Sequence, residues 1–234
     1  MRKKILVISH ERSGTHFLIN TIAQCFDYLP QQIDLDNSQG IDWSNPAMTS
    51  NWMRQFQGRF VANIFKSHHA CPILAPLLPE LIDEYTIFYI QRDGRDVMTS
   101  FWIYLNRLAP GWGPRTRTVG EFMRATAAGG ITQYQTSQHE ITMLQRWVEH
   151  VEGWNLLDIP IHYVSYEDLH TSYDDMLERI AGILEQQVVS SVRPTLESPS
   201  SLPWKGTIGA WKELFTEEDR WYFEQNTKQI QSRT

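Results

Sequence analysis

The sequence predicts an α/β protein whose sheet is mostly parallel and flanked by helices. Short uninterrupted apolar runs alternate along the chain with longer segments whose apolar residues recur every three or four positions. Uninterrupted runs are typical of parallel strands buried on both faces, and the longer period is that of an amphipathic helix. Because strands that alternate with helices form parallel βαβ units, these two patterns together indicate the fold class.

The first strand, turn and helix indicate an anion site. Residues 5–8 are all apolar, a polar turn ends in Ser13, Gly14 and Thr15, and a helix with one apolar face follows. Backbone N–H groups at a helix N-terminus attract anions, and glycine lets a phosphate approach the main chain. The turn is not a Walker A loop, because no lysine follows Gly14 and the cation of the turn, Arg12, precedes it.

The elements that follow continue the alternation. Three further strands are predicted at residues 60–65, 86–91 and 160–165. Amphipathic helices are predicted at residues 97–108, 144–154 and 177–184, with a short helix around Phe122. Residues 31–58 are predicted as loop with a short helix, and the Ser- and Pro-rich residues 190–203 as a loop. No linker divides these elements, so we expect a single domain over residues 1–234.

Composition narrows the class of protein. A chain of 234 residues with 41% hydrophobic residues is long enough for one α/β domain. A net charge of −6 argues against a surface that coats nucleic acid. The two cysteines, Cys25 and Cys71, argue against a disulfide framework and for a reducing compartment. No apolar run is long enough for an export signal or a membrane span, so we expect a cytoplasmic protein.

Polar side chains follow all four predicted strands. In chain order they are Arg12, Ser13 and Thr15, then Lys66 and His68, then Arg92 with Ser100, then Tyr166. Ligands of parallel sheets bind at the carboxyl ends of the strands. We therefore expect three cations, one imidazole and several hydroxyl groups to meet at one edge of the sheet.

Four motifs in these positions resemble the sulfotransferase family. They are Arg12-Ser-Gly-Thr-His-Phe17, Phe65-Lys-Ser-His68, the segment from Tyr89 to Ser100 that contains Arg-Asp-Gly-Arg-Asp, and Lys205-Gly-Thr-Ile-Gly-Ala-Trp-Lys212. They are similar to the family's 5′-phosphosulfate loop, its Lys-Thr-His strand end, its 3′-phosphate motif and its C-terminal glycine segment. The resemblance covers nearly the whole chain. It implies a P-loop-NTPase-like fold and transfer of a sulfuryl group from 3′-phosphoadenosine 5′-phosphosulfate (PAPS) to an acceptor hydroxyl or amine.

The resemblance also implies a role for each matching residue. His68 would be the general base, and Lys66 and Arg12 would neutralise charge on the transferring group. The residues implied in binding PAPS are Arg12, Ser13, Gly14, Thr15, His16, Phe17, Arg92, Ser100, Tyr166, Lys205 and Gly206. We expect His69 to point away from the site, and Asp93, Arg95 and Asp96 to cap a helix or pair on the surface. No metal is expected, because a site built on His68, His69 and Cys71 would lack a third and a fourth ligand.

Some positions depart from the family pattern. Arg12 stands where the family usually has a lysine, His16 replaces a threonine and Phe17 a tryptophan. In the C-terminal segment Trp204 replaces an arginine and Ala210 an aspartate. Arginine keeps the charge, but its planar guanidinium cannot be placed as a point donor, so we expect either slower chemistry or a shifted contact with the leaving group.

Two other functions stay open. A P-loop kinase would bind ADP with Mg²⁺, and a non-catalytic nucleotide-binding protein would keep the fold without turnover. The acceptor is not determined, since aromatic residues suit a phenol, a lipid alcohol or a sugar face. Aromatic residues in segments that could frame an acceptor pocket are Trp43, Trp52, Trp102, Tyr104, Trp112 and Tyr134. Oligomeric state also stays open.

Overall fold

The computed structural model describes residues 3–29, 32–35, 45–55, 64–135, 140–195, 198 and 206–230. Their strands form one sheet in the order β2-β3-β1-β4-β5, and every neighbouring pair is parallel. The strands are β1 (Lys4–Ile8), β2 (Gln32–Asp34), β3 (Ile64–Ser67), β4 (Tyr85–Gln91) and β5 (Ile161–Ser165). The predicted α/β class with a parallel sheet is confirmed.

Helices connect the strands and cover the sheet. The α-helices are α1 (Thr15–Cys25), α2 (Pro46–Arg54), α3 (Cys71–Leu74), α4 (Leu78–Leu81), α5 (Gly94–Arg107), α6 (Val119–Arg124), α7 (Met143–Asn155), α8 (Tyr166–Thr171), α9 (Tyr173–Leu184) and α10 (Glu217–Thr227). Short 3₁₀ helices are η2 (Ala75–Leu77), η3 (Gly129–Tyr134) and η4 (Ala210–Glu213). Among the described helices, none is long and apolar enough to cross a membrane.

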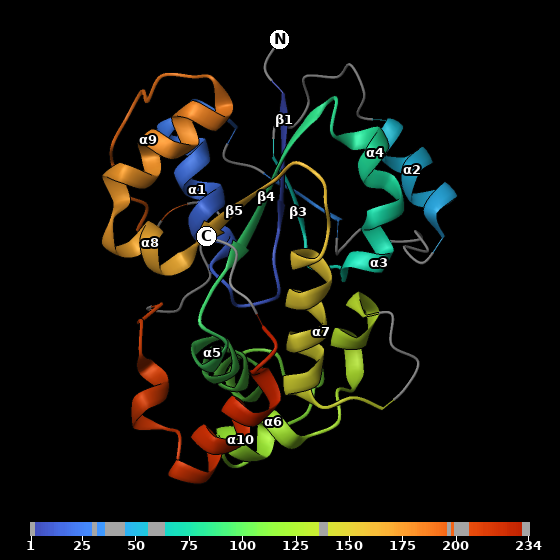
Figure 1. Cartoon of the computed structure of the whole chain (residues 1–234), viewed down its shortest axis with the longest axis vertical. Coiled ribbons are helices and arrows are strands. Elements are labelled where there is room, and N and C mark those ends of the chain that lie inside the picture. The colour runs from blue at the N-terminus through green and yellow to red at the C-terminus, as the bar shows by residue number, and fades with distance from the viewer. Residues whose placement is uncertain are drawn as a thin grey trace.

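The alternation of side chains along β1 builds a core on each face of the sheet. Ile5 and Val7 pack with residues of α1, α8 and α9, whereas Leu6 and Ile8 pack with α3, α4 and the end of α7. Figure 1 shows these groups of helices on opposite sides of the sheet. The four apolar side chains of β1, residues 5–8, are fully buried, which explains the uninterrupted apolar run.

A third core lies beyond the carboxyl ends of the strands. Apolar residues of α5, α6, α7 and α10 pack together there, and Figure 1 shows these helices gathered at that end of the sheet. Asp93 caps α5 by accepting a hydrogen bond from the backbone N–H of Arg95, and Thr142 and Gln145 form a capping box on α7. These helices therefore form a separate layer beyond the carboxyl ends of the strands.

Two predictions about the strands need correction. Residues 32–34 were predicted as loop but form the edge strand β2, which pairs with β3 through Gln32–Ile64, Ile33–Phe65 and Asp34–Lys66. The second predicted strand, residues 60–65, extends to Ser67, while residues 56–63 lie outside the described part of the chain. A strand of three residues with a single β-branched residue, Ile33, gave no recognisable pattern of its own, because pairing with β3 decides its conformation.

Candidate active site

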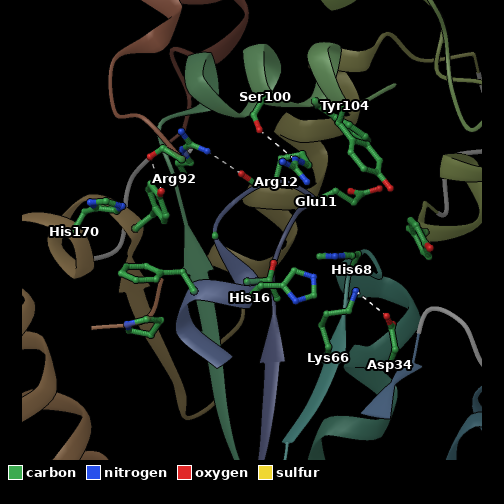
Figure 2. Close-up of a pocket in the computed structure, with 18 of the residues that line it drawn as sticks. Glu11, Arg12, His16, Asp34, Lys66, His68, Arg92, Ser100, Tyr104 and His170 are labelled. Carbon is green, nitrogen blue, oxygen red and sulfur yellow. Dashed lines mark hydrogen bonds and ion pairs between the residues drawn. The ribbon is translucent and has the colours of Figure 1, made fainter. Parts of the chain in front are cut away.

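A cavity of about 630 Å³ lies at the carboxyl ends of the strands. Predicted site residues that line it are Arg12, Gly14, Thr15, His16, Phe17, Lys66, His68, Arg92, Ser100, Tyr166 and Gly206. Figure 2 shows the labelled ones converging from the strand ends and from α5. Ser13 is buried but does not line the cavity, and Lys205 lies outside the described residues. The structure therefore brings most of the predicted site residues together at one cavity.

The turn between β1 and α1 requires glycine at position 14. Gly14 has φ of +96°, a left-handed conformation that side chains disfavour, and it directly precedes α1. A Cβ at this position would lie 2.2 Å from Cδ2 of Tyr166. Thr15 opens the helix, and its hydroxyl lies 2.6 Å from that of Ser9. The N-terminus of α1 therefore lines the cavity, and position 14 carries no side chain that would keep an anion from its backbone N–H groups.

Two guanidinium groups connect this turn to α5 and to the C-terminal segment. Arg12 Nε donates to Ser100 Oγ at 3.1 Å, and the guanidinium lies 4.8 Å from the ring centroid of Tyr104. Arg92 donates to the carbonyls of Arg12 (3.3 Å) and Thr207 (2.9 Å). Burial lowers the pKa of Arg12 to about 10, so it stays charged at neutral pH. Both cations are thereby fixed at one end of the cavity.

His68 is held with its proton on one defined nitrogen. Its Nδ1 lies 2.9 Å from the carbonyl oxygen of Ser9 and 3.2 Å from the Ser9 hydroxyl. A carbonyl only accepts hydrogen bonds, so in the neutral ring Nδ1 carries the proton and Nε2 keeps the lone pair. Burial, and next the charge of Lys66, hold the pKa of His68 well below 6.5. The imidazole is therefore neutral, and able to accept a proton, at neutral pH.

Lys66 is paired with a carboxylate that the sequence did not reveal. Its Nζ lies 3.0 Å from Oδ2 of Asp34 on β2, and both residues line the cavity. His16 stands nearby, and burial followed by the charge of Lys66 lowers its pKa to about 4. Asp34 was missed because β2 was predicted as loop, which left no reason to place it opposite Lys66.

A sequence model of the sulfotransferase domain matches residues 2–233. The chain belongs to the sulfotransferase family. Two relatives are each 21% identical to it, namely sulfotransferase 1B1 of Canis lupus familiaris and sulfotransferase 1C2 of Homo sapiens. The alignments cover 91% of this chain and 78% and 77% of those proteins. The predicted family, and with it the PAPS-dependent sulfotransferase class, is confirmed.

Solved structures agree with this sulfotransferase at the level of the fold. Mouse sulfotransferase SULT7A1, complexed with PAP, has a TM-score of 0.61 at 19% identity and covers 96% of this chain and 82% of its own. Retinol dehydratase, complexed with androsterone and the inactive cofactor PAP, has a TM-score of 0.62 at 16% identity, with coverage of 99% and 82%. The similarity supports the P-loop-like sulfotransferase fold.

Asp96, which was expected on the surface, connects α5 of the sulfotransferase to its C-terminal segment at residues 209–211. Asp96 is 1% exposed, and its carboxylate accepts hydrogen bonds from the backbone N–H groups of Gly209 (2.6 Å) and Trp211 (3.2 Å). Asp93 and Arg95 do pair with each other, as predicted. The expectation for Asp96 was wrong because sequence alone did not bring residues 209–211 to the start of α5.

A second buried ion pair also went unpredicted. Arg146 on α7 contacts the carboxylate of Glu11 at 2.6 and 3.0 Å and His10 Nε2 at 2.8 Å. It also donates to the carbonyl of Ile131 at 3.2 Å. A signal was present, because Arg146 and His150 interrupt the apolar face of α7 four residues apart. Such polar residues on a buried helical face need partners.

His69 and the aromatic candidates divide between cavity and core. His69 is fully buried, its Nδ1 lies 2.8 Å from Ser67 Oγ, and it does not line the cavity. Tyr104, Trp112 and Tyr134 line the cavity, whereas Trp52 and Trp102 pack against the cores, and Trp43 lies outside the described residues. The sequence could not tell which of these aromatic residues line the cavity and which pack in a core, because both environments favour aromatic side chains.

Two residues that no motif indicated line the cavity close to Arg92 and Tyr166. The His170 ring lies 5.1 Å from that of Phe17 and 5.0 Å from that of Tyr166. The guanidinium of Arg193 lies 5.4 Å from the ring centroid of Phe17 and contacts His170. A flat aromatic group would find stacking partners at this end.

Proposed function

We propose that this sulfotransferase transfers a sulfuryl group from PAPS to an acceptor hydroxyl by in-line displacement, with His68 as general base. The observation that carries the proposal is the cavity itself, where the N-terminus of α1, three cations and a neutral imidazole meet. An anionic donor binds at the cationic end, and the acceptor lies beside the imidazole. The cavity can thus hold both partners of a group transfer.

The donor end suits a polyanionic nucleotide. The N-terminus of α1 with Gly14 suits the 5′-phosphosulfate, and Arg92 with Ser100 suits the 3′-phosphate. Two buried nitrogens, Arg92 Nε and His16 Nδ1, have no hydrogen-bond partner within the described residues, and a bound polyanion offers acceptors. Phe17, Tyr166 and His170 suit the base by stacking. Two structural relatives are complexes with PAP, the product of such a donor.

The chemical step moves one proton and exchanges one bond. The acceptor oxygen attacks sulfur while the bond between sulfur and the 5′-phosphate oxygen breaks. Nε2 of His68 takes the hydroxyl proton, and PAP leaves with the electron pair of the broken bond. A base in this position contributes roughly 10²–10⁴-fold in rate.

The cations stabilise charge that moves during the transfer. Lys66 on the strand end faces the transferring group, and Arg12 lies at the turn that holds the 5′-phosphate. In a loose transition state negative charge accumulates on the leaving oxygen, so a fixed cation there lowers the barrier. The bond from Arg12 to Ser100 keeps the guanidinium in place before substrate binds.

Calorimetric binding of PAP against ADP, with and without Mg²⁺, tests the proposal. We expect PAP to bind without metal and more tightly than ADP, and Arg92→Ala to weaken PAP at least about tenfold. Arg107→Ala, at the exposed end of α5, is the matched control and should bind PAP normally. Preference for ADP with Mg²⁺ would favour a kinase, and binding of neither nucleotide would remove the enzyme proposal.

We further propose that the protein works in a reducing compartment such as the cytoplasm. Both Cys25 and Cys71 are free and buried. Burial raises the pKa of Cys71 to about 11, so its thiol stays protonated and unreactive. Such thiols suit a core that forms without disulfides.

A further inference from the structure

Helix α7 presents a row of hydrogen-bond donors to the ends of the strands. Arg146, His150 and Trp154 stand four residues apart, so they share one face of the helix, and all three side chains are buried. Arg146 contacts Glu11, which follows β1, while His150 and Trp154 donate to the chain that follows β3. The partners of this row therefore lie at the carboxyl ends of the strands, where the cavity is.

The chain that carries His68 is attached to α7 as soon as it leaves the sheet. Strand β3 ends at Ser67, the last of its residues paired with β1. The carbonyl of His68 then lies 3.2 Å from Nε2 of His150. The carbonyl of His69 accepts a hydrogen bond from Nε1 of Trp154, also at 3.2 Å. The backbone of the proposed base therefore depends on α7 for its position.

His150 can act only as a donor toward this carbonyl. A carbonyl oxygen only accepts hydrogen bonds, so Nε2 of His150 carries the proton and Nδ1 keeps the lone pair. Nδ1 lies 2.9 Å from the hydroxyl of Tyr89 on β4, which donates to it. Burial holds the pKa of His150 well below 6.5, so the ring is neutral at neutral pH. Its two nitrogens thus have one fixed role each.

The rings around His150 fix its orientation. Tyr89 stacks on it with ring centroids 5.9 Å apart, and His10 meets it edge-on at 5.3 Å. All three side chains are buried. The imidazole of His150 cannot turn without displacing one of these neighbours, so the direction of its N–H bond is set before substrate binds.

A series of hydrogen bonds leads from β4 to the ring of the base. The Tyr89 hydroxyl donates to His150, which donates to the backbone carbonyl of His68. The ring of His68 donates in turn from Nδ1 to the carbonyl of Ser9. Backbone and ring of His68 are thus both held, and Nε2 is the nitrogen that offers its lone pair.

We propose that His150 is a positioning residue for the general base and acts through the backbone carbonyl of His68. The inference rests on the proposed function, which makes His68 the base. A catalytic group must stay within about 0.5 Å and 10–20° of its productive geometry, and a misplacement of about 1 Å costs roughly 10²-fold in rate. His150 does not line the cavity, so it acts on the reaction through His68 and not by touching substrate.

The tautomer of His68 tests the proposal without turnover. Long-range proton–nitrogen NMR on the isotope-labelled protein shows which ring nitrogen carries the proton, and His68→Ala identifies the signals. We expect the Nδ1–H tautomer in the wild type and a mixture of both tautomers in His150→Phe, because the ring then no longer meets the Ser9 carbonyl in one geometry. An unchanged His68 spectrum in this variant overturns the proposal, as does a wild type with the proton on Nε2.

A double-mutant cycle measures the effect on turnover. With radiolabelled PAPS and 4-methylphenol as the acceptor, we expect His150→Phe to lower kcat roughly tenfold to hundredfold, while KM for PAPS changes by less than about threefold. In the His68→Ala background the same substitution should have little further effect, because the group through which it acts is gone. An equal loss in both backgrounds would mean that His150 only stabilises the fold, and it would overturn the proposal.

Matched variants separate positioning from stability. His150→Gln can place an amide N–H near the former Nε2 and should keep kcat within about threefold of the wild type. Tyr89→Phe combined with His150→Phe removes the hydroxyl that His150→Phe leaves without its partner, and it replaces the single variant if that fails to fold. Tyr163→Phe, which removes a 2.7 Å bond to the carbonyl of Trp154 on α7, is the control and keeps the His68 spectrum.

Failure of this inference is distinct from failure of the proposed function. A normal loss of turnover in His68→Ala, with an unchanged His68 spectrum in His150→Phe, removes the positioning role alone. Full turnover in His68→Ala removes the base and, with it, this role of His150. If 4-methylphenol is not sulfated, the NMR comparison decides by itself, since it needs no acceptor.

Discussion

The proton on His68 is placed by the carbonyl of Ser9, at 2.9 Å from Nδ1, and the side chain is 9% exposed. Ser9 directly follows β1 and His68 directly follows β3, so the ends of two neighbouring strands set the tautomer together. The backbone carbonyl of His68 is in turn 3.2 Å from Nε2 of His150 on α7. The position of one nitrogen thus depends on three elements that are far apart in the sequence.

Replacing His68 separates catalysis from donor binding. In His68→Ala we expect turnover to fall by roughly 10²–10⁴-fold, because the acceptor hydroxyl loses its base, while PAP affinity changes little. Sulfate transfer from PAPS and calorimetry with PAP measure the two effects. His162→Ala, on β5 and outside the cavity lining, is the control and should keep turnover. An unchanged rate in His68→Ala would rule out general-base catalysis by this residue.

The pH profile of the reaction follows from the lowered pKa of His68. A base whose pKa lies well below 6.5 stays unprotonated as the pH falls from 8 through 6.5. We therefore expect kcat/KM to be level across this range and to decrease only at clearly lower pH. Initial rates at limiting substrate measure it, and an acid limb centred at or above pH 6.5 would contradict the assignment.

At the scale of single elements, the turn before α1 depends on the absence of one side chain. Gly14→Ala puts a Cβ into the ring of Tyr166 and into a left-handed backbone, so we expect a loss of roughly 1–3 kcal/mol in unfolding free energy. The matched substitution is Gly182→Ala in α9, where a Cβ meets nothing within 4 Å. It should stabilise the protein by up to about 1 kcal/mol. Chemical denaturation of both variants measures the contrast, and equal effects would refute it.

The contact between α5 and the segment before η4 predicts an effect on nucleotide affinity. In Asp96→Asn one carboxylate oxygen becomes an NH₂ group, which cannot accept a hydrogen bond from Gly209 or Trp211. Residues 206–211 then loosen, and we expect PAP to bind about tenfold more weakly with a smaller change in kcat. Titration with PAP tests this, with the exposed Asp158→Asn as control. A variant with normal PAP affinity would show that the contact is only structural.

Sequence predicted well those strands and helices whose conformation follows from the periodicity of their own residues. The run 5–8 and the helical face of α7 are decided by local periodicity, so strand and helix were both found. Strand β2 and the placement of Asp96 depend on partners distant in the chain, about which a local pattern carries no information. Glu11 and Arg146 were missed for the same reason, since 135 positions separate them.

At the scale of the whole molecule, buried neutral histidines make stability depend on pH. His10, His16, His68 and His150 all have a lowered pKa, in each case with burial as the largest cause. The unfolded chain takes up protons at these rings near pH 6.5, whereas the folded protein does so only at lower pH. Stability is therefore fully present above pH 6.5 and is lost as the pH falls below it.

We expect the free energy of unfolding to decrease between pH 6.5 and 5 by up to about 1.4 kcal/mol per pH unit for each such histidine. The lowered pKa of Glu11 acts in the same direction, because acid removes its charge and weakens its pair with Arg146. Denaturant unfolding at a series of pH values measures the slope. Constant stability from pH 7.5 to 5 would contradict the burial of these rings.

The strand order has a consequence for how the chain folds. β1 lies at the centre of the sheet, yet both its neighbours come much later, β3 at Ile64–Ser67 and β4 at Tyr85–Gln91. The apolar residues 5–8 therefore lack both neighbouring strands until β3 has been synthesised, and they lack the second neighbour until β4 has followed. Contacts over such separations form slowly, so the nascent chain is open to aggregation and to chaperones during this interval.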